Sequence, residues 1–96
     1  MTHDEFLRVY GSVDRTEWIA RHPSVVSRGG PCVNAHVRTG GVGRKADACW
    51  IVPLTWDEHN ELHQHGVKTF EAKYGVNLES EACKIAAEWE AEIGEL

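Results

Sequence analysis

Two histidines four residues apart are the first feature of the chain with a clear chemical use. His59 and His63 lie within the segment EHNELHQHG. Residues at this spacing share one face of a helix, so the two imidazoles can bind a single metal ion. Neutral imidazole, the form that binds metals, is well populated near pH 7. Two surface histidines on an ordinary amphipathic helix are the alternative, and the surrounding elements have to decide between the two interpretations.

A helix around this pair is predicted by the residues that begin and end it. The segment Thr55-Trp-Asp-Glu58 is a capping box, in which the Thr55 hydroxyl accepts from the Glu58 amide and the Glu58 carboxylate accepts from the Thr55 amide. Gly66 is placed to end the helix. His65 lies two residues beyond His63 and is expected to point away from the face that carries the pair.

Upstream of this helix, the sequence predicts a β-hairpin. Cys32 to Arg38 can form one strand, the apolar run Cys49 to Val52 can form the returning strand, and Pro53 stops it. Three glycines turn the chain between the strands: Gly40, Gly41 and Gly43. His36 lies on the first strand, so packing the hairpin on the helix brings His36 toward the histidine pair.

Further helices are expected on both sides. One spans residues 14–22, with Asp14 as its cap, and two follow the histidine helix, at Lys68 to Tyr74 and Ser80 to Ile93. At 96 residues the chain is long enough for one core. We therefore predict a single α+β domain over residues 1–96, with a ββα core at about 31–66, an N-terminal helix at about 14–22 and C-terminal helices at about 67–93. Three tryptophans are expected to pack in the core or between helices: Trp50, Trp56 and Trp89.

The order of these pieces resembles a known family. A strand histidine, a glycine turn, an apolar strand ending in Pro-Leu and a helix with His-x-x-x-His form the layout of HNH, or ββα-metal, endonucleases, which include colicin-type DNases and small phage proteins. The blocks that carry the resemblance are PCVNAHVRTGGVGRKADACWIVPL, EHNELHQHG and FEAKYGVNL, within residues 31 to about 80. The resemblance implies a ββα-metal finger with flanking helices in a phage-derived protein.

The resemblance also implies a phosphodiester hydrolase with a histidine base and one divalent ion. His36 would remove a proton from the attacking water. His59 and His63 would bind one Mg²⁺, Mn²⁺, Ni²⁺ or Zn²⁺ ion, which stabilises the leaving oxygen. Arg38, two residues after His36, either assists by contacting a phosphate oxygen of the substrate or is an ordinary solvated residue.

Two positions depart from the pattern of the family. The residue before the base, often an Asp or His that binds the metal, is Ala35, and the place of the middle asparagine is taken by Trp50. The ion would then have two protein imidazoles, completed by waters, phosphate oxygens or a neighbour such as Asn34. Asp47 could take over the orienting role of the missing asparagine through a hydrogen bond to the His36 ring.

Charge is divided unevenly along the chain, whose formal net charge is -5. Residues 1–56 hold seven basic and five acidic side chains, whereas residues 57–96 hold three basic and ten acidic ones. A protein that coats DNA without specificity is disfavoured, because such affinity comes from Lys and Arg. Candidate contacts to nucleic acid, with DNA expected before RNA, lie in the middle of the chain: Arg38, Arg44 and Lys45.

A second class of function follows from the acidic half of the chain and from the departures at Ala35 and Trp50. A catalytically inactive HNH-fold phage protein would bind and inhibit a host protein or nucleoprotein complex. An acidic surface suits that role because it can occupy a basic nucleic-acid channel.

The cysteines and the hydropathy of the sequence indicate the cellular compartment in which the protein is expected. The three cysteines, Cys32, Cys49 and Cys83, never form CxxC, so neither a disulfide framework nor a four-cysteine zinc site is expected. No apolar run approaches the roughly 18 residues of a membrane span. The N-terminal residues lack the apolar stretch of a signal peptide. These features predict no membrane partner and a cytoplasmic location, in the host if a phage encodes the chain.

Overall fold

The computed structural model describes residues 2–37 and 48–94, which form helices around a two-stranded antiparallel sheet. This arrangement confirms the predicted α+β class with a hairpin and flanking helices. The elements follow one another as α1 (His3–Tyr10), α2 (Val13–Ala20), β1 (Cys32–His36), the 3-10 helix η1 (Ala48–Trp50), β2 (Ile51–Thr55), α3 (Trp56–His65), α4 (Val67–Tyr74) and α5 (Leu78–Gly94).

The hairpin pairs β1 with β2 so that Cys32 lies opposite Thr55 and His36 opposite Ile51. Both strands differ from the predicted bounds. The first ends at His36, and Arg38 lies outside the described residues. The second begins at Ile51 because residues 48–50 form η1 instead of extended chain. His36 is therefore the last residue of β1. At the other end of the hairpin, Thr55 is followed directly by α3.

The prediction that Pro53 stops the second strand is wrong. Pro53 lies within β2 and faces Asn34. The Val37 amide donates to the Trp50 carbonyl at 2.9 Å. Because hydrogen-bonded and non-hydrogen-bonded pairs alternate in an antiparallel ladder, the Asn34–Pro53 pair is non-hydrogen-bonded. The proline nitrogen then faces away from β1, so the missing N–H removes no bond of the ladder.

The first two helices also differ from the prediction. The cap of α2 is Ser12, whose hydroxyl accepts from the Arg15 amide at 3.0 Å, while the predicted cap, Asp14, lies in the first turn. Helix α1 was absent from the predicted elements. Its start is stabilised by Thr2, whose hydroxyl accepts from the Glu5 amide at 3.1 Å.

The three C-terminal helices follow the sequence signals closely. Helix α3 has the predicted capping box at Thr55 and ends before Gly66, and α4 ends before Gly75. Gly75 has a φ of +64°, the left-handed conformation that glycine adopts at helix ends. Helix α5 begins two residues before the predicted Ser80, and the Asn77 side chain accepts from the Ser80 amide at 2.8 Å in its first turn.

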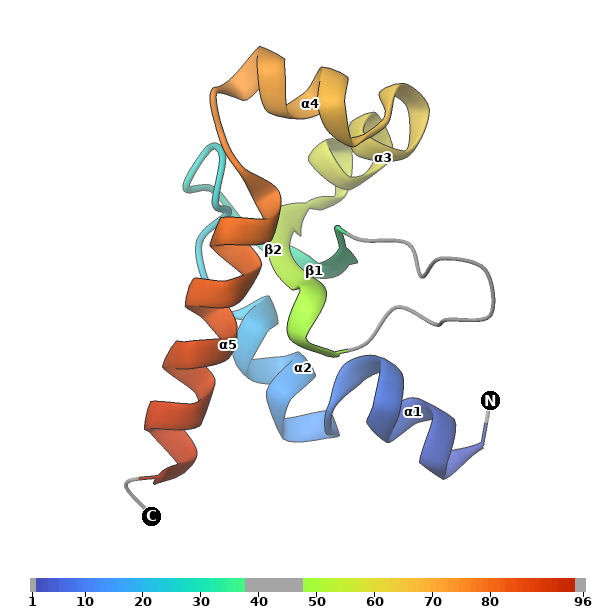
Figure 1. Cartoon of the computed structure of the whole chain (residues 1–96), viewed down its shortest axis with the longest axis vertical. Coiled ribbons are helices and arrows are strands. Elements are labelled where there is room, and N and C mark those ends of the chain that lie inside the picture. The colour runs from blue at the N-terminus through green and yellow to red at the C-terminus, as the bar shows by residue number, and fades with distance from the viewer. Residues whose placement is uncertain (1, 38–47, 95–96) are drawn as a thin grey trace.

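Two groups of buried apolar side chains hold these elements together. Figure 1 shows the hairpin between α1 and α2 at one end and α3 and α4 at the other, with α5 running alongside. One cluster joins the hairpin to α3, α4 and α5: Ala35, Val37, Val52, Leu54, Leu62, Phe70, Leu78 and Ala82. A second cluster, made by Ile19, Ile51 and Ile85, joins α2 and α5 to β2.

Candidate active site

The two histidines of α3 face each other across one helical turn. The Nε2 atoms of His59 and His63 lie 3.0 Å apart, with ring centroids 4.5 Å apart and ring planes at 71°. Two imidazole nitrogens bound to one ion at about 2.1 Å each lie about 3.0 to 3.4 Å apart for bond angles of about 90 to 110°. The observed separation fits a shared ion, and it also fits an N–H···N hydrogen bond between the two rings.

His59 has the more enclosed position of the two. His59 is half-buried and His63 is exposed. Burial lowers the pKa of His59, and the neighbouring imidazoles of His63 and His36 lower it further. Its Nδ1 atom is buried and has no hydrogen-bond partner among the described residues. A lowered pKa favours the neutral ring that binds metals, and an unpartnered buried polar atom is uncommon outside functional sites or sites of bound water and ions.

His36 is held in place by α1. Its Nε2 atom lies 2.8 Å from the Val9 carbonyl oxygen, and the Tyr10 ring meets its ring edge-on, with centroids 5.2 Å apart. A carbonyl oxygen only accepts hydrogen bonds, so Nε2 carries the proton. In the neutral ring the lone pair then lies on Nδ1. The imidazole of His36 is also one of the groups that lower the pKa of His59.

The imidazole nitrogens of His59 and His63 suit a divalent cation that binds nitrogen ligands. Within residues 2–37 and 48–94, no group of three or more His, Cys, Asp or Glu side chains is arranged to hold a metal. Two imidazoles are therefore the candidate protein ligands in this part of the chain, and water or substrate oxygens would complete the coordination of an ion. An ion with few protein ligands keeps open positions, as catalytic sites do and structural zinc sites do not.

The predicted supporting residues have different outcomes. Asn34 is directed toward α2, because its Nδ2 atom donates to the Thr16 carbonyl at 3.0 Å. Its Oδ1 atom is buried without a hydrogen-bond partner in the described part of the chain. Four predicted residues lie outside the described residues, so their roles stay predictions: Arg38, Arg44, Lys45 and Asp47.

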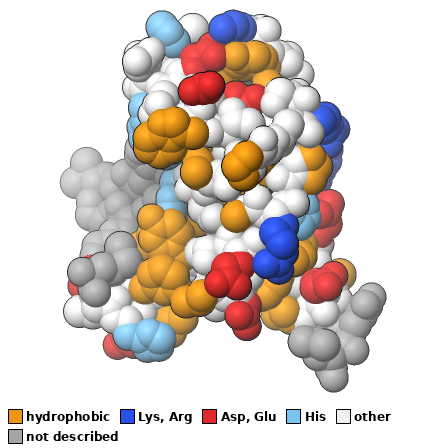
Figure 2. All heavy atoms as spheres, turned by 180° about the vertical axis from the view of Figure 1, so that it is seen from behind, with side chains coloured by type: hydrophobic (Ala, Val, Ile, Leu, Met, Phe, Trp, Pro, Cys, Tyr) orange, Lys and Arg blue, Asp and Glu red, His pale blue; other side chains and the backbone are white. Residues whose placement is uncertain are grey.

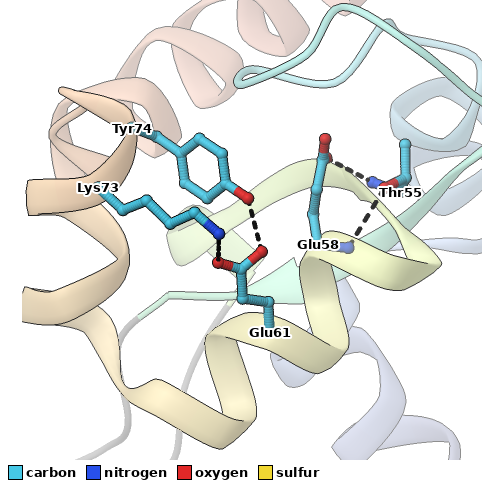
Figure 3. Close-up of polar contacts among 5 residues, drawn as sticks. All are labelled: Thr55, Glu58, Glu61, Lys73 and Tyr74. Carbon is cyan, nitrogen blue, oxygen red and sulfur yellow. Dashed lines mark hydrogen bonds and ion pairs between the residues drawn. The ribbon is translucent and has the colours of Figure 1, made fainter.

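Glu58 fixes the start of the helix that carries the pair. Its Oε1 atom accepts from the Thr55 amide at 2.9 Å and from the Ser24 hydroxyl at 2.6 Å. Figure 3 shows the carboxylate turned back over Thr55. Burial by itself would raise the pKa of Glu58, but hydrogen bonds from Ser24, Ser27 and Thr55 outweigh burial and lower it. The lowered pKa favours the ionised side chain. Its hydrogen bonds connect the first turn of α3 to the hairpin and to the loop before β1.

Glu61 ties α3 to the next helix. Its carboxylate accepts from the Lys73 ammonium at 2.6 Å and from the Tyr74 hydroxyl at 2.5 Å, as Figure 3 shows. Hydrogen bonds from these two side chains lower the pKa of Glu61. Glu61 lies two positions from both His59 and His63, about 200° away around the helix. The contact therefore anchors α4 on the side of α3 opposite to the pair.

The contribution of α1 to the candidate site does not follow from local sequence patterns. Val9 and Tyr10 contact His36, yet this segment was assigned no helix. A signal for the helix was present, because Thr2 and Glu5 have capping spacing and Gly11 follows the last turn. Its contact with His36 spans 27 positions of sequence, so no local pattern could have located it.

Trp56 is not a core residue as predicted. Its side chain is 61% exposed, and its ring centroid lies 6.0 Å from that of His59. Trp56 lies two positions before the buried Glu58, about 200° around the helix, so it faces solvent. The other two tryptophans pack as predicted, Trp50 against the main cluster and Trp89 against Trp18 at 5.2 Å between centroids.

The described surface offers no continuous basic area on the face drawn in Figure 2, where Lys and Arg side chains form small separate groups. Helix α5 exposes a series of acids: Glu79, Glu88, Glu90 and Glu92. Among the helices of the described ranges, none combines the length and the apolar character needed to cross a membrane. The predicted basic contacts, Arg38, Arg44 and Lys45, lie outside the described residues.

Comparison with known proteins identifies the family of the chain. A family model described as "Protein of unknown function (DUF968)" matches residues 7–94. The chain belongs to the DUF968 family. The match extends from the second half of α1 to the end of α5, so the DUF968 region includes His36, the α3 pair and the Val9 carbonyl that contacts His36.

One relative of this DUF968 chain is the uncharacterized protein YdfU of Escherichia coli (strain K12). The two are 38% identical over 68 residues, which cover 67% of this chain and 19% of YdfU. The chain thus spans about a fifth of the length of this relative. No solved structure matches the chain.

Proposed function

We propose that this DUF968 chain is a metal-dependent endonuclease that hydrolyses phosphodiester bonds with an HNH-type site. The observation that carries the proposal is the 3.0 Å approach of the His59 and His63 Nε2 atoms on α3, with His36 on the adjoining strand. The order β1, β2, α3 supports the proposal, because it is the order that the HNH resemblance implies.

His59 and His63 would hold one divalent ion, Mg²⁺, Mn²⁺, Ni²⁺ or Zn²⁺. Bound there, such an ion supplies positive charge to the phosphate and stabilises the leaving oxygen. His36 acts as the general base at Nδ1, which takes a proton from water. The water oxygen forms a bond to phosphorus while the bond from phosphorus to the leaving oxygen breaks. The leaving oxygen takes a proton from solvent, and the proton on Nδ1 is released to solvent. The products are a phosphate monoester and a hydroxyl.

The proposed substrate is nucleic acid, with DNA before RNA. The acidic C-terminal helix disfavours binding by a broad basic surface, so the phosphate contacts are assigned to Arg38, Arg44 and Lys45. The protein would act in the cytoplasm, which is that of the host if a phage encodes the chain. These assignments rest on the HNH resemblance and on the charge distribution.

Nicking of supercoiled plasmid in the presence of each of the four ions tests the proposal. We expect His36→Ala and His59→Ala to lose cleavage, with the loss of the base alone costing about 10²- to 10⁴-fold. His65→Ala is the matched control, because His65 is exposed on the same helix and takes no part in the pair. Undiminished cleavage by both the His36 and the His59 variants would refute the assignment.

A catalytically inactive HNH-fold protein that inhibits a host protein or nucleoprotein complex is the second candidate. The exposed glutamates of α5 favour it, because they could enter a basic nucleic-acid channel. Such a protein would fold and yet cleave no nucleic acid with any of the four ions. Capture of a nucleic-acid-binding protein from nuclease-treated host lysate at low salt, lost when these glutamates are changed to lysine, would favour this candidate over the nuclease.

A further inference from the structure

We propose that the C-terminal end of α1 is the positioning device for His36, with the Val9 carbonyl fixing the proton on Nε2 and the Tyr10 ring fixing the plane of the imidazole. This inference rests on the proposed function, in which Nδ1 of His36 takes the proton. It gives α1 the orienting task that the HNH resemblance implies for an asparagine, whose place is taken here by Trp50.

The Val9 carbonyl is free for this task because of its place in the helix. The last four carbonyls of an α-helix have no partner within the helix. In α1 the Leu7 carbonyl is taken by the Gly11 amide at 2.8 Å, where the chain leaves the helix at a φ of +91°. The Val9 carbonyl instead accepts from His36 Nε2 at 2.8 Å. A strand residue therefore satisfies an end group of α1 that would otherwise need solvent or a cap.

The same contact persists when the ring takes up a proton during the reaction. When Nδ1 takes a proton, both nitrogens of His36 carry hydrogen and the ring becomes positive. Because Nε2 already donates to α1, the charge forms without any change of hydrogen-bond partner. The end of α1 thus acts on His36 as a buried carboxylate acts on the histidine of a catalytic triad.

Tyr10 restricts the rotation of the ring. Its own ring meets His36 at an interplanar angle of 65°, and it also lies against Phe6, with centroids 5.2 Å apart. Tyr10 packs as well against the buried cluster made by Ile19, Ile51 and Ile85. Tyr10 is therefore a positioning residue held by the core, and Val9 is one through its backbone carbonyl. Neither contacts the reacting atoms in this proposal.

A backbone ester tests the role of the Val9 carbonyl directly. The full chain can be assembled by ligation at Cys49 with an ester in place of the amide between Val9 and Tyr10, which weakens the Val9 carbonyl as an acceptor. The matched control carries the ester between Leu7 and Arg8, which weakens the Leu7 carbonyl that accepts from Gly11. Both proteins lose one amide N–H of α1. The readouts are ¹⁵N NMR of the His36 tautomer and the plasmid-cleavage rate.

The unmodified chain should show a single His36 tautomer with the proton on Nε2. The Val9–Tyr10 ester should show a mixture of tautomers and cleave about 10-fold more slowly, whereas the Leu7–Arg8 ester should match the unmodified chain in both readouts. Tyr10→Ala should also slow cleavage, and Tyr10→Phe should retain the rate because it keeps the ring.

Two results would overturn the inference. One is a His36 proton on Nδ1, or a mixture of tautomers, in the unmodified chain. The other is an equal effect of both esters, which would mean that α1 has a purely structural role. Absence of cleavage by the unmodified chain together with the expected tautomer pattern would refute the proposed nuclease function, while it would support the positioning of His36 by α1.

Discussion

The Ser24 hydroxyl donates a 2.6 Å hydrogen bond to Glu58, which lies 34 positions later in the chain. The same carboxylate accepts from the Thr55 amide and so links the loop before β1, the end of the hairpin and the start of α3. His59 is the next residue along the chain. The orientation of the candidate metal ligands therefore depends on a contact that forms only in the folded protein.

The lowered pKa of Glu58 predicts a loss of stability in acid. A carboxyl whose pKa is lower in the folded state stabilises the fold above its unfolded pKa of about 4.3, and this contribution disappears as the pH falls through the folded value. Glu58→Gln should lower the free energy of unfolding at pH 7 by about 1 to 3 kcal/mol, the range for a hydrogen-bonded charged group. Urea denaturation at pH 7, 5 and 3 measures the effect.

The difference between wild type and Glu58→Gln should shrink as the pH falls, because the wild-type carboxylate becomes protonated. Glu79→Gln is the matched control, since Glu79 is exposed in the first turn of α5. A constant difference between wild type and Glu58→Gln from pH 7 to pH 3 would contradict the assigned role of the Glu58 charge.

Metal binding should depend on both members of the α3 pair. We expect His59→Ala and His63→Ala each to weaken Ni²⁺ or Zn²⁺ binding by at least about 10-fold, because each removes one of two imidazole ligands. Isothermal titration calorimetry measures the change, and His65→Ala should bind as the wild type does. Equal weakening by the His65 variant would show that the ions bind histidines of this region without selecting the pair.

Phe70 should be a major contributor to stability. Its side chain is 1% exposed and lies in the cluster that joins the hairpin to α3, α4 and α5. Phe70→Ala should lower the free energy of unfolding by about 3 to 5 kcal/mol through lost burial and the cavity left behind. Val67→Ala, on the same helix at 37% exposure, should cost far less. Chemical denaturation of the two variants gives the comparison, and similar costs would contradict the described packing.

Glycine should be favoured over other residues at position 75 only because of the backbone conformation there. At its φ of +64° a side chain is strained, yet a Cβ added there would meet no heavy atom within 4 Å. Gly75→Ala should therefore cost about 1 kcal/mol. Gly94→Ala is the control, because Gly94 lies in α5 and also has open space around it. Thermal unfolding would contradict the interpretation if both substitutions had the same effect.

Much of the fold could be predicted because its signals are local. The Thr55–Glu58 capping box and the glycines at positions 66 and 75 mark the ends of α3 and α4 within a residue. Predictions failed where the outcome depended on another residue, either a better cap or the partner across the hairpin. Ser12 caps α2 in place of Asp14, and the ladder alternation allows Pro53 inside β2. Neither outcome follows from residue preferences considered one position at a time.

The candidate site also has a part that local sequence signals predict and a part that they do not. The spacing of His59 and His63 predicts that they share a face, and their rings meet as expected. The contact between His36 and the Val9 carbonyl depends on how α1 packs against the end of the hairpin, and sequence spacing carries no information about that packing. The spacing of the pair does not distinguish one metal from another, because imidazole pairs bind several metals.

The exposed ring of Trp56 has a practical consequence. It lies 6.0 Å from the His59 ring and is 61% exposed, so its emission should respond to whatever occupies the neighbouring histidines. A paramagnetic ion such as Ni²⁺ at the pair would quench Trp56 more strongly than it quenches Trp18 and Trp89, whose rings meet at a tilt of 53° between α2 and α5. The protein therefore carries its own fluorescent reporter beside the candidate metal ligands.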